Sequence, residues 1–369
     1  MAENNDICLY EKISGDIKEL ILSEKIKYRE KVPSVSDIRR KYSVSHITAM
    51  RVFRELADES YIEYIRGRGY FANFQKEDAG KRNFASVCCI TRPSRETTLH
   101  DNYFNNINQS VQRELMKGKF NPVYPFCNYS FADKEPDKDA LEDVKAAILE
   151  FDGKTDGFII DERIPDAVIA SVKSKISKPI VIVGRKSDLD IDTVSPDNEN
   201  GARKAVELCL KMNYEFFCIG RNAMLINNNQ EERTEAFMKT LRKNNVPEKQ
   251  MFCFEYNMTP YEETFALIEK KLDHNLKTLI FSPTDNFARW LIDVFTKKGI
   301  KLGGKLGVMG FEGMGFSTLR EPHITTVDVH PSEMGGKAVE ILLSRINGTN
   351  FQKKQNYTVP ATLQIGESI

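Results

Sequence analysis

The first part of the chain carries apolar positions at helical spacing, interrupted by residues that start new helices. Over 9–21 the apolar side chains recur every three or four positions, which predicts an amphipathic helix ending near Ser23. Ser34 can cap a second helix, and Asp37, three positions later, can complete a capping box. That second helix is expected to end at about Tyr42.

The next pattern changes from helical spacing to strand alternation. The turn 43–45 ends in a serine that can cap a third helix over about 46–59. Residues 61–65 alternate as in a strand, two glycines then permit a tight turn, and 70–72 begin a returning strand. The order predicted is helix, helix-turn-helix and two-stranded wing.

From residue 85 onward, short apolar runs alternate with amphipathic segments, which is typical of parallel sheets covered by helices on both faces. Two sets of strands with similar spacing are expected to begin near Ser86, Phe120, Asp156 and Pro179, and near Glu215, Met251, Thr278 and Leu306. Two such sheets place a small-ligand cleft at the carboxyl ends of their strands. The fold class expected is therefore α/β, behind a small α+β domain.

The polar, mixed-charge stretch in between indicates a linker. We therefore expect a winged helix-turn-helix domain at 1–72, a linker at 73–84 and a two-lobed domain at 85–369.

Charge is informative only locally, because the 369 residues carry 53 Lys or Arg and 53 Asp or Glu. The segment 38–54 has no acidic residue and several basic ones, and the wing adds two more arginines. These cations are Arg39, Arg40, Lys41, Arg51, Arg54, Arg66 and Arg68. Because they fall on the second helix, the third helix and the wing, they predict a surface that meets duplex DNA.

Other classes of protein are disfavoured. No apolar run approaches the 18 or so residues of a membrane span, and the first nine residues lack the order of a signal peptide, so a cytoplasmic protein is expected. Seven cysteines without a C-x-x-C pair suggest reduced thiols. Gly299 to Lys305 has P-loop spacing, but Leu306 replaces the Ser or Thr, and the order of elements is reversed.

Four short motifs of the first domain carry a family resemblance. They are Val32-Pro33-Ser34, Val44-Ser45-His46-Ile47-Thr48, Leu56-Ala57-Asp58 and Gly67-Arg68-Gly69-Tyr70-Phe71. Together they make 8–72 resemble the winged helix-turn-helix of GntR-family transcription regulators. The chain differs from the common family pattern at Val35-Ser36, His46 and Met50, so the family's base contacts are not carried over.

The DNA-binding candidates divide into phosphate-contacting and base-reading side chains. Arg39, Arg40, Lys41 and Arg68 are expected on phosphates. Arg51 is expected on guanine, and Ile47 and Met50 on thymine methyl groups, although Met50 pointing into the core is an equal alternative. The resemblance adds Ser34, Ser45, His46 and Thr48.

The second part of the chain resembles the effector domain of the LacI/GalR family over roughly residues 85–369. The motifs are Val194-Ser195-Pro196-Asp197-Asn198-Glu199-Asn200-Gly201-Ala202, Arg233-Thr234-Glu235-Ala236-Phe237, Thr284-Asp285, Gly310-Phe311-Glu312 and Ile324-Thr325-Thr326-Val327. The resemblance implies a periplasmic-binding-protein-like fold, usually for sugars, in which the chain crosses between lobes more than once. Lobe 1 is then expected at about 85–193 plus 328–355, and lobe 2 at about 196–325 plus 356–369.

A sugar site needs groups that bond hydroxyls and an aromatic ring. The resemblance and its planar guanidinium favour Arg233, with a structural ion pair to a nearby glutamate as the alternative. Asp285 and Glu312 are acceptor candidates at strand-to-helix junctions. Tyr103 or Phe104 could supply the ring, although each could equally be helix core.

Taken together, these features predict a transcription regulator, with repression as the expected mode, that binds operator DNA as a homodimer. Its plan is similar to that of arabinose-responsive repressors. The expected effector is a monosaccharide bound between the lobes. No cofactor, metal, membrane partner or catalytic residue is expected. A sugar-processing enzyme with a DNA-binding head is the alternative.

Overall fold

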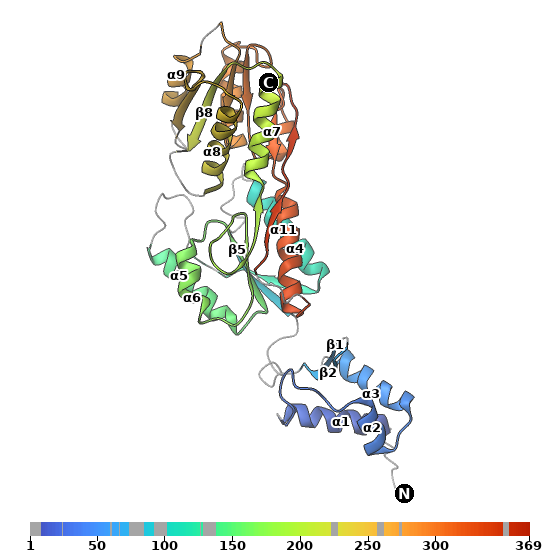
Figure 1. The fold of residues 1–369 in the computed structure, drawn as a ribbon. Helices are drawn as coiled ribbons and strands as arrows, with labels where there is room; N and C mark the ends of the chain where they lie inside the picture. The colour runs from blue at the N-terminus through green and yellow to red at the C-terminus, as the bar shows by residue number, and fades with distance from the viewer. Residues whose placement is uncertain are drawn as a thin grey trace. The chain divides into compact units, whose positions relative to one another are not determined.

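The computed structural model divides the chain into two compact units, Met1–Asn83 and Phe84–Ile369, which are described separately (Figure 1). The residues that the structure describes are 9–23, 25–59, 61–65, 67–73, 85–91, 102–125, 127, 138–222, 228–256, 262–272, 275–349 and 354–369. Most of the expected linker lies outside them, so its structure is not described. Within these ranges, no helix is long and apolar enough to cross a membrane.

The first unit is three helices and a two-stranded antiparallel wing, as the sequence predicted. Its elements are α1 (Leu9–Leu22), α2 (Val35–Tyr42), α3 (His46–Asp58), β1 (Ile62–Ile65) and β2 (Gly69–Ala72). Apolar side chains from all three helices form one core, in which Ile13, Ile38 and Phe53 are almost inaccessible to solvent. The core fixes α3 against α1 and leaves the other face of α3 exposed.

The second unit contains a six-stranded parallel sheet in the order β13-β7-β6-β5-β3-β4. The strands are β3 (Ala85–Ile90), β4 (Phe120–Val123), β5 (Gly157–Asp161), β6 (Ile180–Val183), β7 (Asp192–Pro196) and β13 (Asn356–Val359). Apolar residues of α4 (Asn102–Lys117) and α11 (Pro331–Ile346) pack with one set of strand side chains, and those of α5 (Lys138–Asp152) and α6 (Asp166–Lys173) with another. The sheet is therefore buried on both faces.

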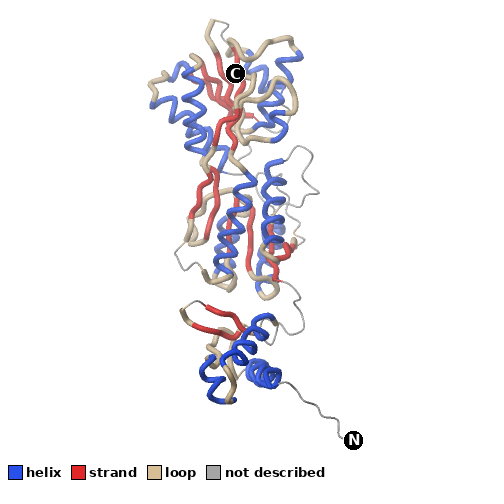
Figure 2. Tube along the Cα trace, turned by 90° about the vertical axis from the view of Figure 1, so that its right-hand side faces the viewer, coloured by secondary structure: helices blue, strands red, loops and turns tan. Residues whose placement is uncertain are grey.

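A four-stranded parallel sheet forms the second lobe, in the order β11-β10-β8-β9. Its strands are β8 (Phe216–Asn222), β9 (Met251–Tyr256), β10 (Thr278–Phe281) and β11 (Leu306–Met309). The helices around it are α7 (Asn198–Lys211), α8 (Asn228–Lys243), α9 (Glu262–Glu269) and α10 (Asp285–Lys297), with two short 3-10 helices at Glu248–Gln250 and Gly315–Thr318. Figure 2 shows helices on both sides of these strands. The predicted α/β class and all eight expected strand positions are confirmed.

The end of the chain corrects one predicted boundary. Residues 356–369 were expected in the second lobe, but β13 pairs in parallel with β7 and so forms an edge of the first sheet. The reason is that α11 packs on α4, so the chain leaves that helix beside the first sheet. Only β14 (Thr362–Gln364) and the residues after it join the second lobe, where β14 pairs with β12 (Thr326–Asp328). The other lobe limits stay a prediction.

Candidate DNA-binding surface and effector site

Two serines fix where α2 and α3 begin. The Ser34 hydroxyl accepts a hydrogen bond from the Asp37 amide at 3.2 Å, and the Asp37 carboxylate accepts one from the Ser34 amide at 3.0 Å. The Ser45 hydroxyl accepts a hydrogen bond from the Thr48 amide at 3.1 Å. The predicted capping roles are confirmed, and these side chains place the two helices.

The cations predicted on phosphates lie at the solvent-exposed end of α2 and at the tip of the wing. Arg39, Arg40 and Lys41 occupy the last turn of α2, and Arg40 forms an exposed ion pair with Asp37 at 2.9 Å. Arg68 is exposed in the turn between β1 and β2. Arg66, also expected here, lies outside the described residues. The described cations are available to phosphates, and their contacts stay a prediction.

The outer face of α3 carries the residues expected to read bases. His46 and Arg51 are exposed, and the Ile47 side chain is 81% exposed, which is unusual for an isoleucine. Met50 is only half-buried, so it is neither committed to the core nor fully outside it. These four residues help to line one surface hollow of about 750 Å³, together with Tyr10, Arg54, Glu55 and Glu59.

Tyr10 is a residue of this surface that sequence reasoning missed. The guanidinium carbon of Arg51 lies 3.8 Å from the centroid of the Tyr10 ring. Stacking uses the face of the guanidinium and leaves the donors in its plane available for a base edge. Tyr10 lies on the apolar side of α1, three positions before Ile13. Its spacing therefore predicts a core residue and gives no indication of a contact with Arg51.

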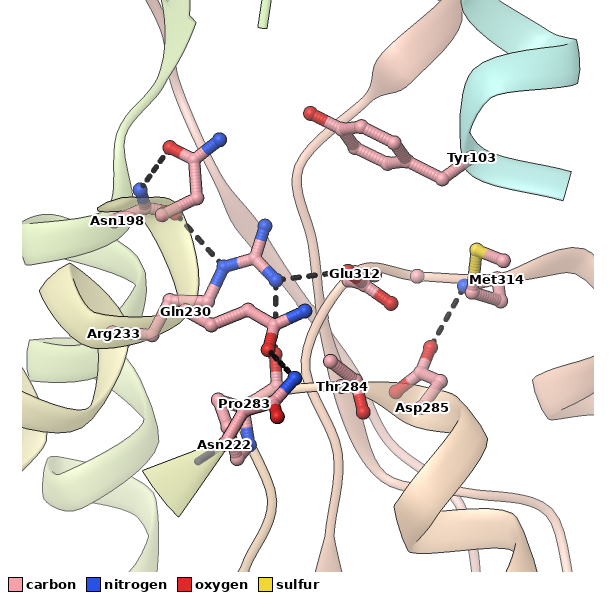
Figure 3. Close-up of polar contacts among 12 residues, drawn as sticks. Tyr103, Asn198, Asn222, Gln230, Arg233, Pro283, Thr284, Asp285, Glu312 and Met314 are labelled. Atoms are coloured by element: carbon pink, nitrogen blue, oxygen red, sulfur yellow. Dashed lines mark hydrogen bonds and ion pairs between the residues drawn. The ribbon is translucent and has the colours of Figure 1, made fainter. Parts of the chain in front are cut away.

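In the second unit, Arg233 lies in α8 and is 1% exposed. Its Nε donates to Asn198 Oδ1 at 3.1 Å, and its Nη1 donates to the Pro283 carbonyl at 2.9 Å and to Glu312 Oε1 at 3.0 Å (Figure 3). Nη2 donates to no group within the described parts of the chain. A ligand would therefore meet one terminal nitrogen rather than the whole fork.

Glu312 and Asp285 have different surroundings. Glu312 follows β11, has a φ of 125° and pairs with Arg233. Asp285 is 0% exposed and accepts hydrogen bonds from the Met314 amide, Ser317 Oγ and Thr326 Oγ1 at 2.8, 2.8 and 2.6 Å. Burial raises the pKa of Asp285, while these hydrogen bonds act in the opposite direction. The Asp285 carboxylate thus holds the segment after Glu312 in place, and a contact of Asp285 with a ligand stays a prediction.

Tyr103 and Phe104 are both buried near the start of α4, with their rings edge to face at 5.0 Å. The Tyr103 hydroxyl donates to Glu162 Oε2 at 3.4 Å. Burial raises the pKa of Tyr103 well above its ordinary value, and the nearby Glu162 carboxylate raises it further. Of the two rings, Tyr103 is therefore the one joined to the polar network.

Side chains that the sequence analysis did not select join the two lobes. Asn229 of α8 donates from Nδ2 to Glu162 Oε2 at 2.8 Å and to the Gly184 carbonyl at 2.6 Å. Glu162 and Gly184 follow β5 and β6 of the first sheet. Asn198 Nδ2 donates to Asn229 Oδ1 at 2.9 Å, which connects this bridge to Arg233. The only sequence signal was polarity, because Asn229 stands in the polar run 227–231.

Comparisons with known proteins find a family match within each unit. Residues 9–71 match the family described as bacterial regulatory proteins, gntR family. Residues 214–369 match the family described as periplasmic binding protein-like domain. Within the described part of the chain, no group of three His, Cys, Asp or Glu side chains could hold a metal ion.

Two curated relatives align over nearly the whole chain. The HTH-type transcriptional repressor MelR of Bacillus subtilis (strain 168) is 21% identical over 100% of this chain and 97% of its own length. The arabinose metabolism transcriptional repressor of Geobacillus stearothermophilus is 20% identical over 93% of each chain. A crystal structure of a LacI family transcriptional regulator from Enterococcus faecium with bound ribose has a TM-score of 0.62 and 17% identity, covering 77% of this chain and 98% of that one. The last likeness shows the fold.

Proposed function

We propose that this chain, which joins a GntR-type helix-turn-helix domain to a periplasmic-binding-protein-like domain, is a transcription repressor controlled by a small sugar. The observation that carries the proposal is Arg233, a nearly inaccessible cation at the boundary of two lobes with one terminal nitrogen still unbonded within the described residues. An N–H donor without an acceptor is unfavourable in a nearly inaccessible place, so a ligand hydroxyl that accepts a hydrogen bond from it would favour binding.

The ligand is a small uncharged sugar in this proposal. Arg233 is already paired with Glu312, so the site has little positive charge left for an anion. Two other proteins support a sugar: the Enterococcus faecium regulator holds ribose, and the Geobacillus stearothermophilus relative is named for arabinose metabolism. Binding would add contacts to the Asn229 bridge between the lobes and favour their closed arrangement.

On DNA, we propose that the exposed end of α2 and the wing position the protein, with Arg39, Arg40, Lys41 and Arg68 on phosphates. Ile47, Met50 and Arg51 of α3 would then meet base edges in the major groove. Since helix-turn-helix proteins read paired half-sites as dimers, we propose a homodimer acting in the cytoplasm.

The competing function is a sugar-processing enzyme with a DNA-binding head. We propose that the chain is not an enzyme, because the curated relatives that align over its length are named repressors. Catalytic turnover of a bound sugar would show that the chain is an enzyme.

The test has two steps. Selection from random duplex DNA should yield a two-fold symmetric operator bound by the full chain. A panel of neutral sugars is then screened for thermal stabilisation, where a true effector at 100 times its dissociation constant adds about 2.7 kcal/mol. That sugar should change the midpoint of operator binding. A chain that selects no sequence, or that converts the sugar into a product, would contradict the proposal.

A further inference from the structure

A second hollow lies at the amino ends of strands in the first sheet, and the strands' carboxyl ends face the Arg233 site. It has a volume of about 590 Å³ and is formed where β6 and β7 begin, beside the ends of α6 and α11. Glu162 and Gly184, which bridge to Asn229, follow the carboxyl ends of β5 and β6. Because the strands are parallel, the two regions are at opposite ends of the same sheet.

The hollow has an apolar floor and a cationic rim. Apolar side chains of Ile176, Pro179, Ile180 and Ile191 form part of its lining. The charged lining residues are Lys173, Lys178, Arg345, Lys354, Asp190 and Asp192. Four cations against two carboxylates leave an excess of two positive charges, although the whole chain is neutral.

One ion pair forms part of the wall of the hollow. Arg345 donates from Nε and Nη2 to the two Asp192 oxygens at 2.7 and 2.8 Å. The Gln355 amide donates to the same carboxylate at 2.7 Å. Asp192 is therefore paired with Arg345, and it forms no ion pair with Lys173, Lys178 or Lys354.

The lysines are half-buried yet have no carboxylate partner among the described residues. Lys173 donates to the Asp190 carbonyl, and Lys354 to the Ser187 carbonyl at 2.6 Å. Each ammonium has three donors, so each keeps two. The Lys178 ammonium forms no hydrogen bond or ion pair with any residue that the structure describes. Neutral carbonyls hold these ammonium groups in place without cancelling their charge.

We propose that this hollow is a second ligand site, for a small phosphate monoester. A monoester dianion matches the excess of two positive charges, and its phosphate oxygens would accept from the unused lysine donors. The volume falls in the range of small-ligand pockets, and the apolar floor would contact the body of the ligand. This proposal does not depend on operator binding or on the sugar of the proposed function.

Calorimetric titration of the full chain with four probes tests the chemistry of the site. We expect phenyl phosphate to bind, inorganic phosphate to bind more weakly because it lacks an apolar body, and benzyl alcohol not to bind. Dimethyl phosphate, which has the single charge of a nucleic-acid backbone phosphate, should bind at least about tenfold more weakly than phenyl phosphate. Equal affinity for dimethyl phosphate would overturn the proposal, as would the failure of phenyl phosphate to bind.

Matched lysine variants locate the site. The double variant Lys178→Gln with Lys354→Gln should weaken phenyl phosphate binding by about tenfold or more, because each substitution removes one charged hydrogen-bond donor. Lys175→Gln is the control, because Lys175 is exposed in the same segment and does not line the hollow. Equal loss in the control, or unchanged binding in the double variant, would refute the site. Thermal unfolding of each variant confirms that it is folded, so a loss of binding is not a loss of structure.

Discussion

The sequence position of Arg233 could not separate two alternative roles. The sequence offered a ligand contact or an ion pair with a nearby glutamate, but the partner is Glu312, which is distant in sequence. Glu231 and Glu235 pair with Arg221 instead. Because the Arg233–Glu312 pair is buried, removing one partner leaves an uncompensated charge.

Arg233→Ala should therefore lower stability and remove the effector response. The free energy of unfolding of the second unit should fall by about 3–5 kcal/mol, because Glu312 loses its partner. Unfolding in denaturant measures this loss, and operator release against sugar concentration measures the response. In Arg233→Met with Glu312→Gln, stability should recover while the response stays absent. A response midpoint within about threefold of wild type would remove Arg233 from the ligand site.

Tyr10 should act on DNA recognition through Arg51. Replacing Tyr10 with Leu removes the stacked ring and should weaken operator binding by about 0.5–1 kcal/mol, whereas Tyr10→Phe keeps the ring and should bind like wild type. Gel-shift titration on operator and on random DNA separates specificity from general affinity. In an Arg51→Ala background the Tyr10→Leu effect should disappear; if it persists, the tyrosine acts elsewhere.

At the scale of elements, the start of α2 depends on a reciprocal pair of hydrogen bonds. Ser34→Ala should lower the free energy of unfolding of the first unit by about 1 kcal/mol. Ser36→Ala, an exposed change inside the same helix, should stay within about 0.5 kcal/mol of wild type. Equal effects of the two changes would show that the cap is unimportant.

The same cap predicts a pH dependence. Hydrogen bonds from Ser34 lower the pKa of Asp37 in the folded chain. A lowered pKa stabilises the fold above the ordinary pKa of Asp, and this contribution is lost as the pH falls through the lowered value. The difference between wild type and Ser34→Ala should therefore shrink in acid. Urea titrations over the acidic pH range measure the difference in the free energy of unfolding between the two proteins. A difference that grows as the pH falls would contradict the predicted direction.

Element positions were predictable because each strand and helix has a local pattern. Ser34 and Ser45 start helices through contacts only three residues away, and the apolar runs of β5 and β6 indicate buried strands without further context. β13 was assigned to the wrong lobe because its partner β7 is distant in sequence. The Tyr10–Arg51 stack and the Asn229–Glu162 bridge were missed for the same reason.

At the scale of the whole molecule, each unit has its own core, so each should unfold on its own. We expect calorimetry of the full chain to show two transitions, and residues 1–75 alone to fold, because the core of the first unit is closed within them. An effector sugar should raise only the transition of the second unit. The isolated 1–75 segment should bind operator much more weakly, since it lacks the proposed dimer contacts. Undiminished binding by this segment would contradict a dimer formed through the second unit.

The return of the chain to both lobes at its end has a consequence for synthesis on the ribosome. The first sheet gains its edge strand only at 356–359, and the second lobe gains β14 and Ser368, which donates to the Val308 carbonyl, later still. At about 5–20 residues per second, the first unit emerges tens of seconds before either lobe can be completed. A nascent chain would thus present a finished DNA-binding domain while its second unit is still unfinished.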